Sequence, residues 1–174
     1  PMIWVSALTF TPFQLRGEEI LFQNFNGQYW RLVTPVFLHF EWLHIVFNSL
    51  WLWELGRRVE QVLGHFNMVM LFLVIAVVSN VSQFAFGGAA LFGGMSGVVY
   101  GLLGFSWVAP LLQPGWRIQP SSSIMLFMVG WLVLCMAGMV EVLGFGAIAN
   151  AAHVGGLVCG AALGLIFGAL SRMG

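Results

Sequence analysis

The chain has 174 residues, of which 60% are hydrophobic and 7% are charged, and its formal net charge is zero. A soluble domain of this length carries far more charged side chains, so the composition excludes an ordinary soluble protein and favours a helical membrane protein. A zero net charge offers no basic surface for nucleic acid. The two cysteines, Cys135 and Cys159, lie in apolar stretches and are poor candidates for a disulfide framework or a zinc site.

Residues 1–37 are predicted to form an external or interfacial loop. Residues 1–13 are apolar, but they are too few to span a bilayer, and Pro12 interrupts them. A polar segment follows and leads to Trp30 and Arg31. Taken alone, this pair is typical of an ordinary interfacial anchor.

Five apolar spans follow the loop, each predicted to be a transmembrane helix. They cover about residues 38–55, 66–84, 96–112, 123–140 and 147–170. The first is expected to end at the run Gly56-Arg57-Arg58.

The arginines predict the orientation of these spans. If the spans alternate in direction, Arg57, Arg58, Arg117 and Arg172 all fall on one side of the membrane. The positive-inside rule makes that side cytoplasmic. The start of the third span and the start of the last span then lie near the outer face, at similar depth.

A serine between glycines stands at the start of the third span, in the stretch Gly93-Gly94-Met95-Ser96-Gly97. Such a stretch is a weak signal alone, because glycine and serine also pack membrane helices. The signal is strengthened by polar residues in other spans, where ionisable groups are costly and are functional candidates. These are His39, His44 and Asn48 in the first span and His153 in the last.

Serine as nucleophile, histidine as base, and histidine and asparagine as oxyanion donors form a complete set for acyl transfer. Ser96 begins a helix, whose free N–H groups favour a developing anion. His44 and Asn48 are four residues apart and share one helix face. Their alternative role is a buried hydrogen-bonded pair that holds helices together. Because the chain contains no Asp and no Glu is placed to orient His153, a Ser-His dyad is expected rather than a triad.

Two rows of glycines predict that the third and last spans pack closely. The rows are Gly97, Gly101 and Gly104, and Gly156, Gly160 and Gly164. This packing would bring Ser96 and His153 within hydrogen-bond reach, with Tyr100 on the same face and able to stack on the imidazole. The alternative is that both rows are only packing seams.

As a set, these motifs resemble the rhomboid family of intramembrane serine proteases. The matching segments are Trp30-Arg31, residues 39–48, 60–64, 93–100 and 150–160. The resemblance implies an all-α polytopic membrane protein with a rhomboid-like helical bundle, forming a single membrane domain over residues 1–174. It implies a serine endopeptidase that hydrolyses peptide bonds in or near transmembrane segments of membrane proteins, with no cofactor and no metal.

The resemblance also implies roles for single residues. Ser96 is the nucleophile and His153 its general base, while His44, Asn48 and the Ser96 N–H surround the oxyanion. Tyr100 packs on His153, Trp30 and Arg31 stabilise the external loop, and His39 supports the site. Substrate helices pass between the first and fourth spans, where Phe47 and Met139 are candidate gate residues. The other supporting positions in the motifs are Gly94, Gly97, Asn150, Gly156, Gly160 and Glu60.

One departure from the family pattern concerns the number of helices. The family core has six spans, and its first helix precedes the external loop with which this chain begins. Since only five spans are present and the chain starts at Pro1, we expect that the first helix is missing by truncation. The expected location is the bacterial inner membrane, with the active site towards the periplasm. The partners are transmembrane substrates and the bilayer, and no oligomeric state is predicted.

Three other functions fit parts of the pattern. A transporter or proton pathway would relay protons through the histidines and Glu41. A membrane haem protein would use two histidines as axial ligands. A catalytically inactive rhomboid-like protein would bind membrane proteins without cutting them, but that loss of activity usually goes with loss of the serine or the histidine.

Overall fold

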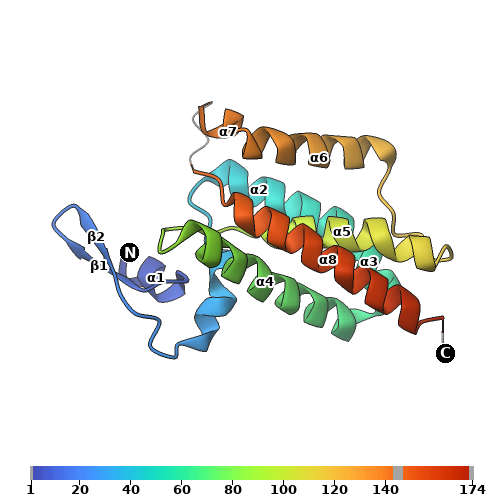
Figure 1. Cartoon of the computed structure of the whole chain (residues 1–174), viewed down its shortest axis with the longest axis horizontal. Helices are drawn as coiled ribbons and strands as arrows, with labels where there is room; N and C mark the ends of the chain where they lie inside the picture. The colour runs from blue at the N-terminus through green and yellow to red at the C-terminus, as the bar shows by residue number, and fades with distance from the viewer. Residues whose placement is uncertain (1, 143–146, 173–174) are drawn as a thin grey trace.

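The structure, a computed structural model, describes residues 2–142 and 147–172. The predicted domain over residues 1–174 therefore includes residues 1, 143–146 and 173–174, which lie outside the described part. The chain folds as a bundle of helices with a small N-terminal segment at one end (Figure 1).

The N-terminal segment has regular structure where only a loop was predicted. It contains a short helix, a two-stranded hairpin and two 3₁₀ turns: α1 (Met2–Leu8), β1 (Phe13–Arg16), β2 (Glu19–Phe22), η1 (Tyr29–Leu32) and η2 (Thr34–Phe37). The strands are antiparallel, with Phe13 opposite Phe22 and Arg16 opposite Glu19. Gly17 has a φ of 67° in the turn, a left-handed conformation that glycine adopts without steric cost.

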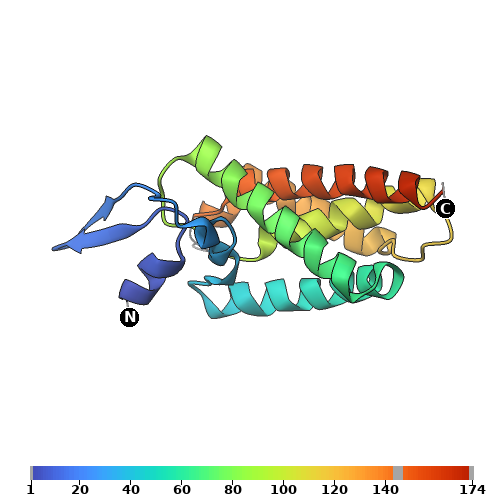
Figure 2. The same ribbon diagram turned by 90° about the horizontal axis from the view of Figure 1, so that it is seen from below.

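The remaining elements of regular structure among the described residues are helices, as predicted. The elements are α2 (Trp42–Trp51), the π-helical turn η3 (Leu52–Gly56), α3 (Arg57–Leu63), α4 (His65–Gly87), α5 (Ser96–Leu112), α6 (Ser122–Met136), α7 (Met139–Val142) and α8 (Asn150–Leu170). In Figures 1 and 2 the longer helices run along the length of the molecule. Helix α5 contacts α2, α4, α8 and η3, and most of its residues are buried, so it is the central helix.

The predicted limits of the first span do not match the helix. The helix begins at Trp42, so His39 lies in the preceding loop, and the helical backbone continues through Arg57 and Arg58 as far as Leu63. The helix ends before Gly64, whose φ of 79° takes the backbone out of the helical region. Gly56 keeps a helical φ of −63° and does not end the helix. The Arg58 guanidinium forms an ion pair with the Glu54 carboxylate one turn earlier, so its charge is compensated within the same helix.

The other helices lie close to the predicted spans. Helices α4 and α5 agree with about 66–84 and 96–112, but α6 ends at Met136, because Gly138 (φ 72°) separates it from α7, and α8 begins at Asn150 rather than 147. By length and composition, α4 and α8 are apolar enough to cross a membrane, and α5 and α6 are shorter apolar helices. The positions of the membrane boundaries stay predictions.

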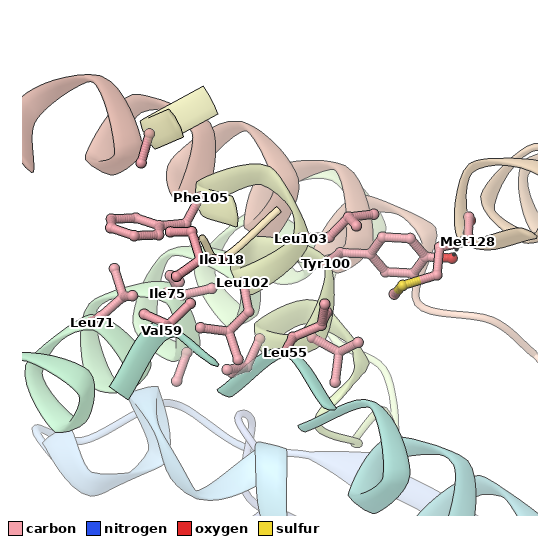
Figure 3. Packing of buried hydrophobic residues seen from close by; sticks show 14 of the residues in the cluster. Leu55, Val59, Leu71, Ile75, Tyr100, Leu102, Leu103, Phe105, Ile118 and Met128 are labelled. Carbon is pink, nitrogen blue, oxygen red and sulfur yellow. Dashed lines mark hydrogen bonds between the residues drawn. The ribbon is translucent and has the colours of Figure 1, made fainter. Parts of the chain in front are cut away.

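The outer surface of the bundle is strongly apolar. Phe66, Phe86 and Leu126 are 74%, 85% and 76% exposed, which is unusual for large apolar side chains in water and is expected where lipid replaces water. Inside, Leu55, Leu102 and Phe105 are fully buried in one cluster around α5 (Figure 3). The fold is therefore a helical bundle whose exterior suits a bilayer.

Candidate active site

Ser96 and His153 meet where two helices begin. Ser96 is the first residue of α5, and His153 lies in the first turn of α8. Nε2 of His153 lies 2.8 Å from Oγ of Ser96, and the histidine is only 5% exposed. The close approach predicted from the glycine spacing is therefore present in the structure. A buried imidazole at this distance can accept the hydroxyl proton of a serine.

The glycine rows explain why α5 and α8 approach so closely. A methyl group at Gly156 would collide with the carbonyl oxygen of Gly97, and one at Gly160 would collide with that of Gly101. The two backbones are thus in direct contact, and this helix pair has the most extensive contact of any two elements. A side chain at Gly156 or Gly160 would push α8 away from α5 and so move His153 away from Ser96.

Tyr100 and Asn150 lie beside His153. The Tyr100 ring centroid is 4.9 Å from that of His153, with the planes tilted by 40°. The buried Tyr100 hydroxyl donates to the Met128 carbonyl of α6 at 3.0 Å, which holds the ring in place (Figure 3). The amide of Asn150 donates to the Cys135 carbonyl at 3.1 Å. The histidine is thus held between α5, α6 and its own helix.

No carboxylate takes part in this arrangement among the described residues. Oε1 of Glu141 accepts from the Ile148 N–H at 3.0 Å. Nδ1 of His153 and Oδ1 of Asn150 are both buried and have no partner among residues 2–142 and 147–172. The two residues are three apart on α8 and so share a face. The geometry is that of a serine and a histidine without a third acidic member.

His44 and Asn48 lie against the loop before Ser96. Gly94 has a φ of 116°, and a Cβ there would lie 2.7 Å from Nε2 of His44 and 3.6 Å from Nδ2 of Asn48. Both side chains come from one face of α2, as their spacing predicted. They lie beside the first turn of α5, whose backbone N–H groups have no acceptor within the helix. The His44 and Asn48 side chains and the N–H groups at the start of α5 therefore lie close together, beside Gly94.

His39 connects these donors. Its Nε2 lies 2.9 Å from Nδ2 of Asn48 and 3.4 Å from the Met95 backbone nitrogen. Because both of those nitrogens are donors, Nε2 of His39 is the acceptor and the ring proton belongs on Nδ1. The Asn48 amide has a second N–H that this bond does not use. His39 thus orients Asn48 from outside α2.

Trp30 and Arg31 tie the N-terminal segment together. Nη1 of Arg31 donates to the carbonyls of Ser6 (2.5 Å) and Thr9 (2.8 Å), and Nε1 of Trp30 donates to the carbonyl of Ala7 at 3.3 Å. This segment is joined to the site because the Gly94 N–H donates to the Pro35 carbonyl at 3.0 Å. These contacts are consistent with the prediction that Trp30 and Arg31 stabilise the external loop.

Three further predicted positions, like Trp30 and Arg31, form no hydrogen bond, ion pair or ring contact with Ser96 or His153 among the described residues. Glu60 on α3 pairs with His65, the first residue of α4. Helix α3 lies towards the end of the bundle away from the hairpin (Figure 2). The candidate gate residues Phe47 and Met139 are 53% and 50% exposed on α2 and α7.

Two polar residues at the end of α4 have positions that the sequence analysis did not assign. Oε1 of Gln83 accepts from the Ala152 N–H at 3.1 Å, so it caps the start of α8 next to His153. The side chain of Ser79 faces Gly97, where a Cβ would be 2.7 Å from it. Their positions in the last turns of an apolar span could have indicated a role in contacts between helices, since polar groups need partners in a membrane.

Comparison with known proteins finds a matching family and similar sequences. The rhomboid domain model matches residues 26–170. Proteins named rhomboid protease GlpG are similar to the chain. The one from Pectobacterium atrosepticum is 41% identical over 155 residues, 89% of this chain and 52% of the relative. Those from Serratia proteamaculans and Yersinia pseudotuberculosis are 47% and 46% identical over 133 residues, each covering 76% of this chain and 46% of the relative.

The chain spans about half the length of the curated relatives it matches. The matched range contains both Ser96 and His153, together with every helix from α2 to α8. The chain belongs to the rhomboid family.

Proposed function

We propose that this chain is the catalytic part of an intramembrane serine endopeptidase that cleaves peptide bonds in or near transmembrane segments. The observation that carries the proposal is the 2.8 Å distance between Nε2 of His153 and Oγ of Ser96, at the start of two helices that glycines hold in contact. The protease names of the relatives support the same activity. The dyad needs no cofactor.

The chemistry follows from the positions of these groups. Oγ of Ser96 attacks the carbonyl carbon of the scissile peptide while its proton passes to Nε2 of His153. The negative oxygen that forms is stabilised by His44, by Asn48 and by the Ser96 N–H. When the C–N bond breaks, the leaving amine takes the proton from His153. A water then attacks the acyl ester, its proton passing to His153 and on to Oγ of Ser96 as the acid product leaves.

We infer that five spans cross a bacterial inner membrane with the Ser96 end towards the periplasm. Substrate helices would reach Ser96 between α2 and α6. Support for this path is the sparse contact between those helices, where the Trp51 and Phe127 rings lie 5.8 Å apart. Phe47 and Met139 are the gate residues proposed for this opening. Their half-exposed side chains suit a contact that a substrate could displace.

A fluorophosphonate probe tests the proposed activity. It forms a bond only with an activated serine, so we expect labelling of the wild-type chain in detergent and none in Ser96→Ala or His153→Ala. A longer chain that adds an N-terminal helix, as in the family pattern, is labelled in parallel. Labelling that survives Ser96→Ala, or that is absent from both wild-type chains, would contradict the proposal.

His44→Ala tests the oxyanion donors separately. Loss of one such donor typically lowers kcat about 10²–10³-fold, because the charge forms only in the transition state. We expect that drop in kcat with little change in KM, measured on a transmembrane substrate in vesicles. Leu43→Ala on the exposed side of the same helix is the matched control. Equal kcat values for His44→Ala and wild type would exclude His44 from the oxyanion site.

A further inference from the structure

Arg31 is a buried cation without an acidic partner among the described residues. Its side chain is only 5% exposed, and burial lowers the pKa of its guanidinium. The ion pairs of the described residues join Arg58 to Glu54 and His65 to Glu60. A buried charge is costly unless an opposite charge or several hydrogen bonds compensate it.

The hydrogen bonds of Arg31 leave one edge of the guanidinium unused. Nη1 donates to two backbone carbonyls, and Nε donates to Oε1 of Gln28 at 2.5 Å. All three acceptors are neutral. Within the described residues, Nη2 donates to nothing, although a guanidinium has five N–H donors. Two charged donors are therefore available to a ligand.

A cavity that is open to the solvent lies beside this arginine. Its volume is about 590 Å³, and its walls come from α1, the hairpin and the segment before η1. This size is within the roughly 300–1,000 Å³ of ligand pockets. Besides Arg31, its polar side chains include Gln14, Gln23 and Gln28. Since Oε1 of Gln28 accepts from Arg31, its amide N–H groups are left as donors.

The lining favours an anion. The described residues that line the cavity include no Asp or Glu, and Glu18 and Glu19, at the turn of the hairpin, are exposed and do not line it. The hairpin itself carries exposed Leu15, Ile20 and Leu21, which suit the boundary between lipid tails and head groups. At that boundary, the free N–H groups of Arg31 and the neighbouring glutamine amides are suited to donate to the oxygen atoms of a phosphate.

We propose that this cavity binds a phosphate group, with Arg31 as its charged donor and the three glutamines as neutral ones. The phosphate is that of a lipid head group or free inorganic phosphate. Its charge supplies the counter-ion that Arg31 lacks and holds α1 against the hairpin. This site is separate from Ser96 and does not depend on proteolysis.

The test is thermal unfolding of the whole chain in a neutral maltoside detergent. One arm adds sodium phosphate at constant ionic strength, with sodium chloride as the reference. The other arm adds short-chain phosphatidylglycerol, with a phosphate-free diacylglycerol of the same chain length as the reference. We expect at least one arm to raise Tm by about 3 °C or more at saturation, because a ligand that binds only the folded state stabilises it.

Isosteric variants decide whether the shift belongs to this cavity. Gln14→Glu and Gln23→Glu each place a carboxylate at the rim while leaving the bonds of Arg31 intact. We expect both to lose most of the shift, and the exposed Gln61→Glu on α3 to keep it. A shift from phosphatidylglycerol alone assigns a lipid head group, and a shift from sodium phosphate, with or without one from the lipid, assigns free phosphate. The absence of any shift, or a full shift in both rim variants, would overturn the proposal.

Discussion

Replacement of Ser96 by alanine is expected to abolish cleavage of a transmembrane substrate, and His153→Ala is expected to be almost as inactive. In the proposed mechanism the serine supplies the bond-forming oxygen and the histidine removes its proton, so neither is expected to work alone. In serine proteases, loss of either group costs about 10⁶ in kcat. Because the two act as one unit, the double variant should be no slower than the worse single variant. Initial cleavage rates in vesicles measure this.

The control for this experiment is Ser106→Ala. Ser106 is fully buried in the same helix, and its hydroxyl has no partner among the described residues. Its replacement removes a hydroxyl from α5 without touching His153, so kcat should stay within about twofold of wild type. Multiplicative losses in the Ser96→Ala/His153→Ala double variant would show that the two residues act independently. That result would contradict a shared catalytic step.

Gly160→Val is expected to have the largest effect on the fold. A Cβ at this position would overlap the carbonyl oxygen of Gly101, so a branched side chain can fit only if α8 moves away from α5. Overpacking of a tight interface costs about 1–3 kcal/mol and more when the backbone cannot yield. We expect a cost at the upper end of that range or beyond, because the colliding atom is a backbone atom. The movement would also break the contact between Ser96 and His153.

Thermal unfolding and fluorophosphonate labelling measure the two consequences. Gly130→Val is the matched control, because a Cβ at Gly130 on α6 meets nothing within 4 Å. It should unfold near the wild-type temperature and keep its labelling. A Gly160→Val protein with wild-type Tm and normal turnover would show that close contact between α5 and α8 is not required.

Much of the helical layout was predictable from local sequence. Long apolar stretches gave the approximate limits of α4 and α5, because hydrophobicity and helix propensity act over neighbouring residues. The first helix shows the limit of this reasoning, since Gly56 looked like a stop and Gly64 is the real one. A glycine ends a helix only where the backbone takes a positive φ, and that depends on the packing around it. The four-residue strands were too short to give an alternating pattern.

The sequence by itself determined which residues are available for chemistry and which helix faces are small enough to touch. Serine, histidine and two glycine rows predicted the approach of Ser96 to His153. Only the tertiary structure decided the partner of each polar group: His39 for Asn48, Gln83 for the start of α8, and the Ser6 and Thr9 carbonyls for Arg31. Those pairs come from different elements, and in the case of Gln83 from positions 69 residues apart. Spacing along a chain defines one helix face, whereas hydrogen bonds between elements depend on how those elements pack in space.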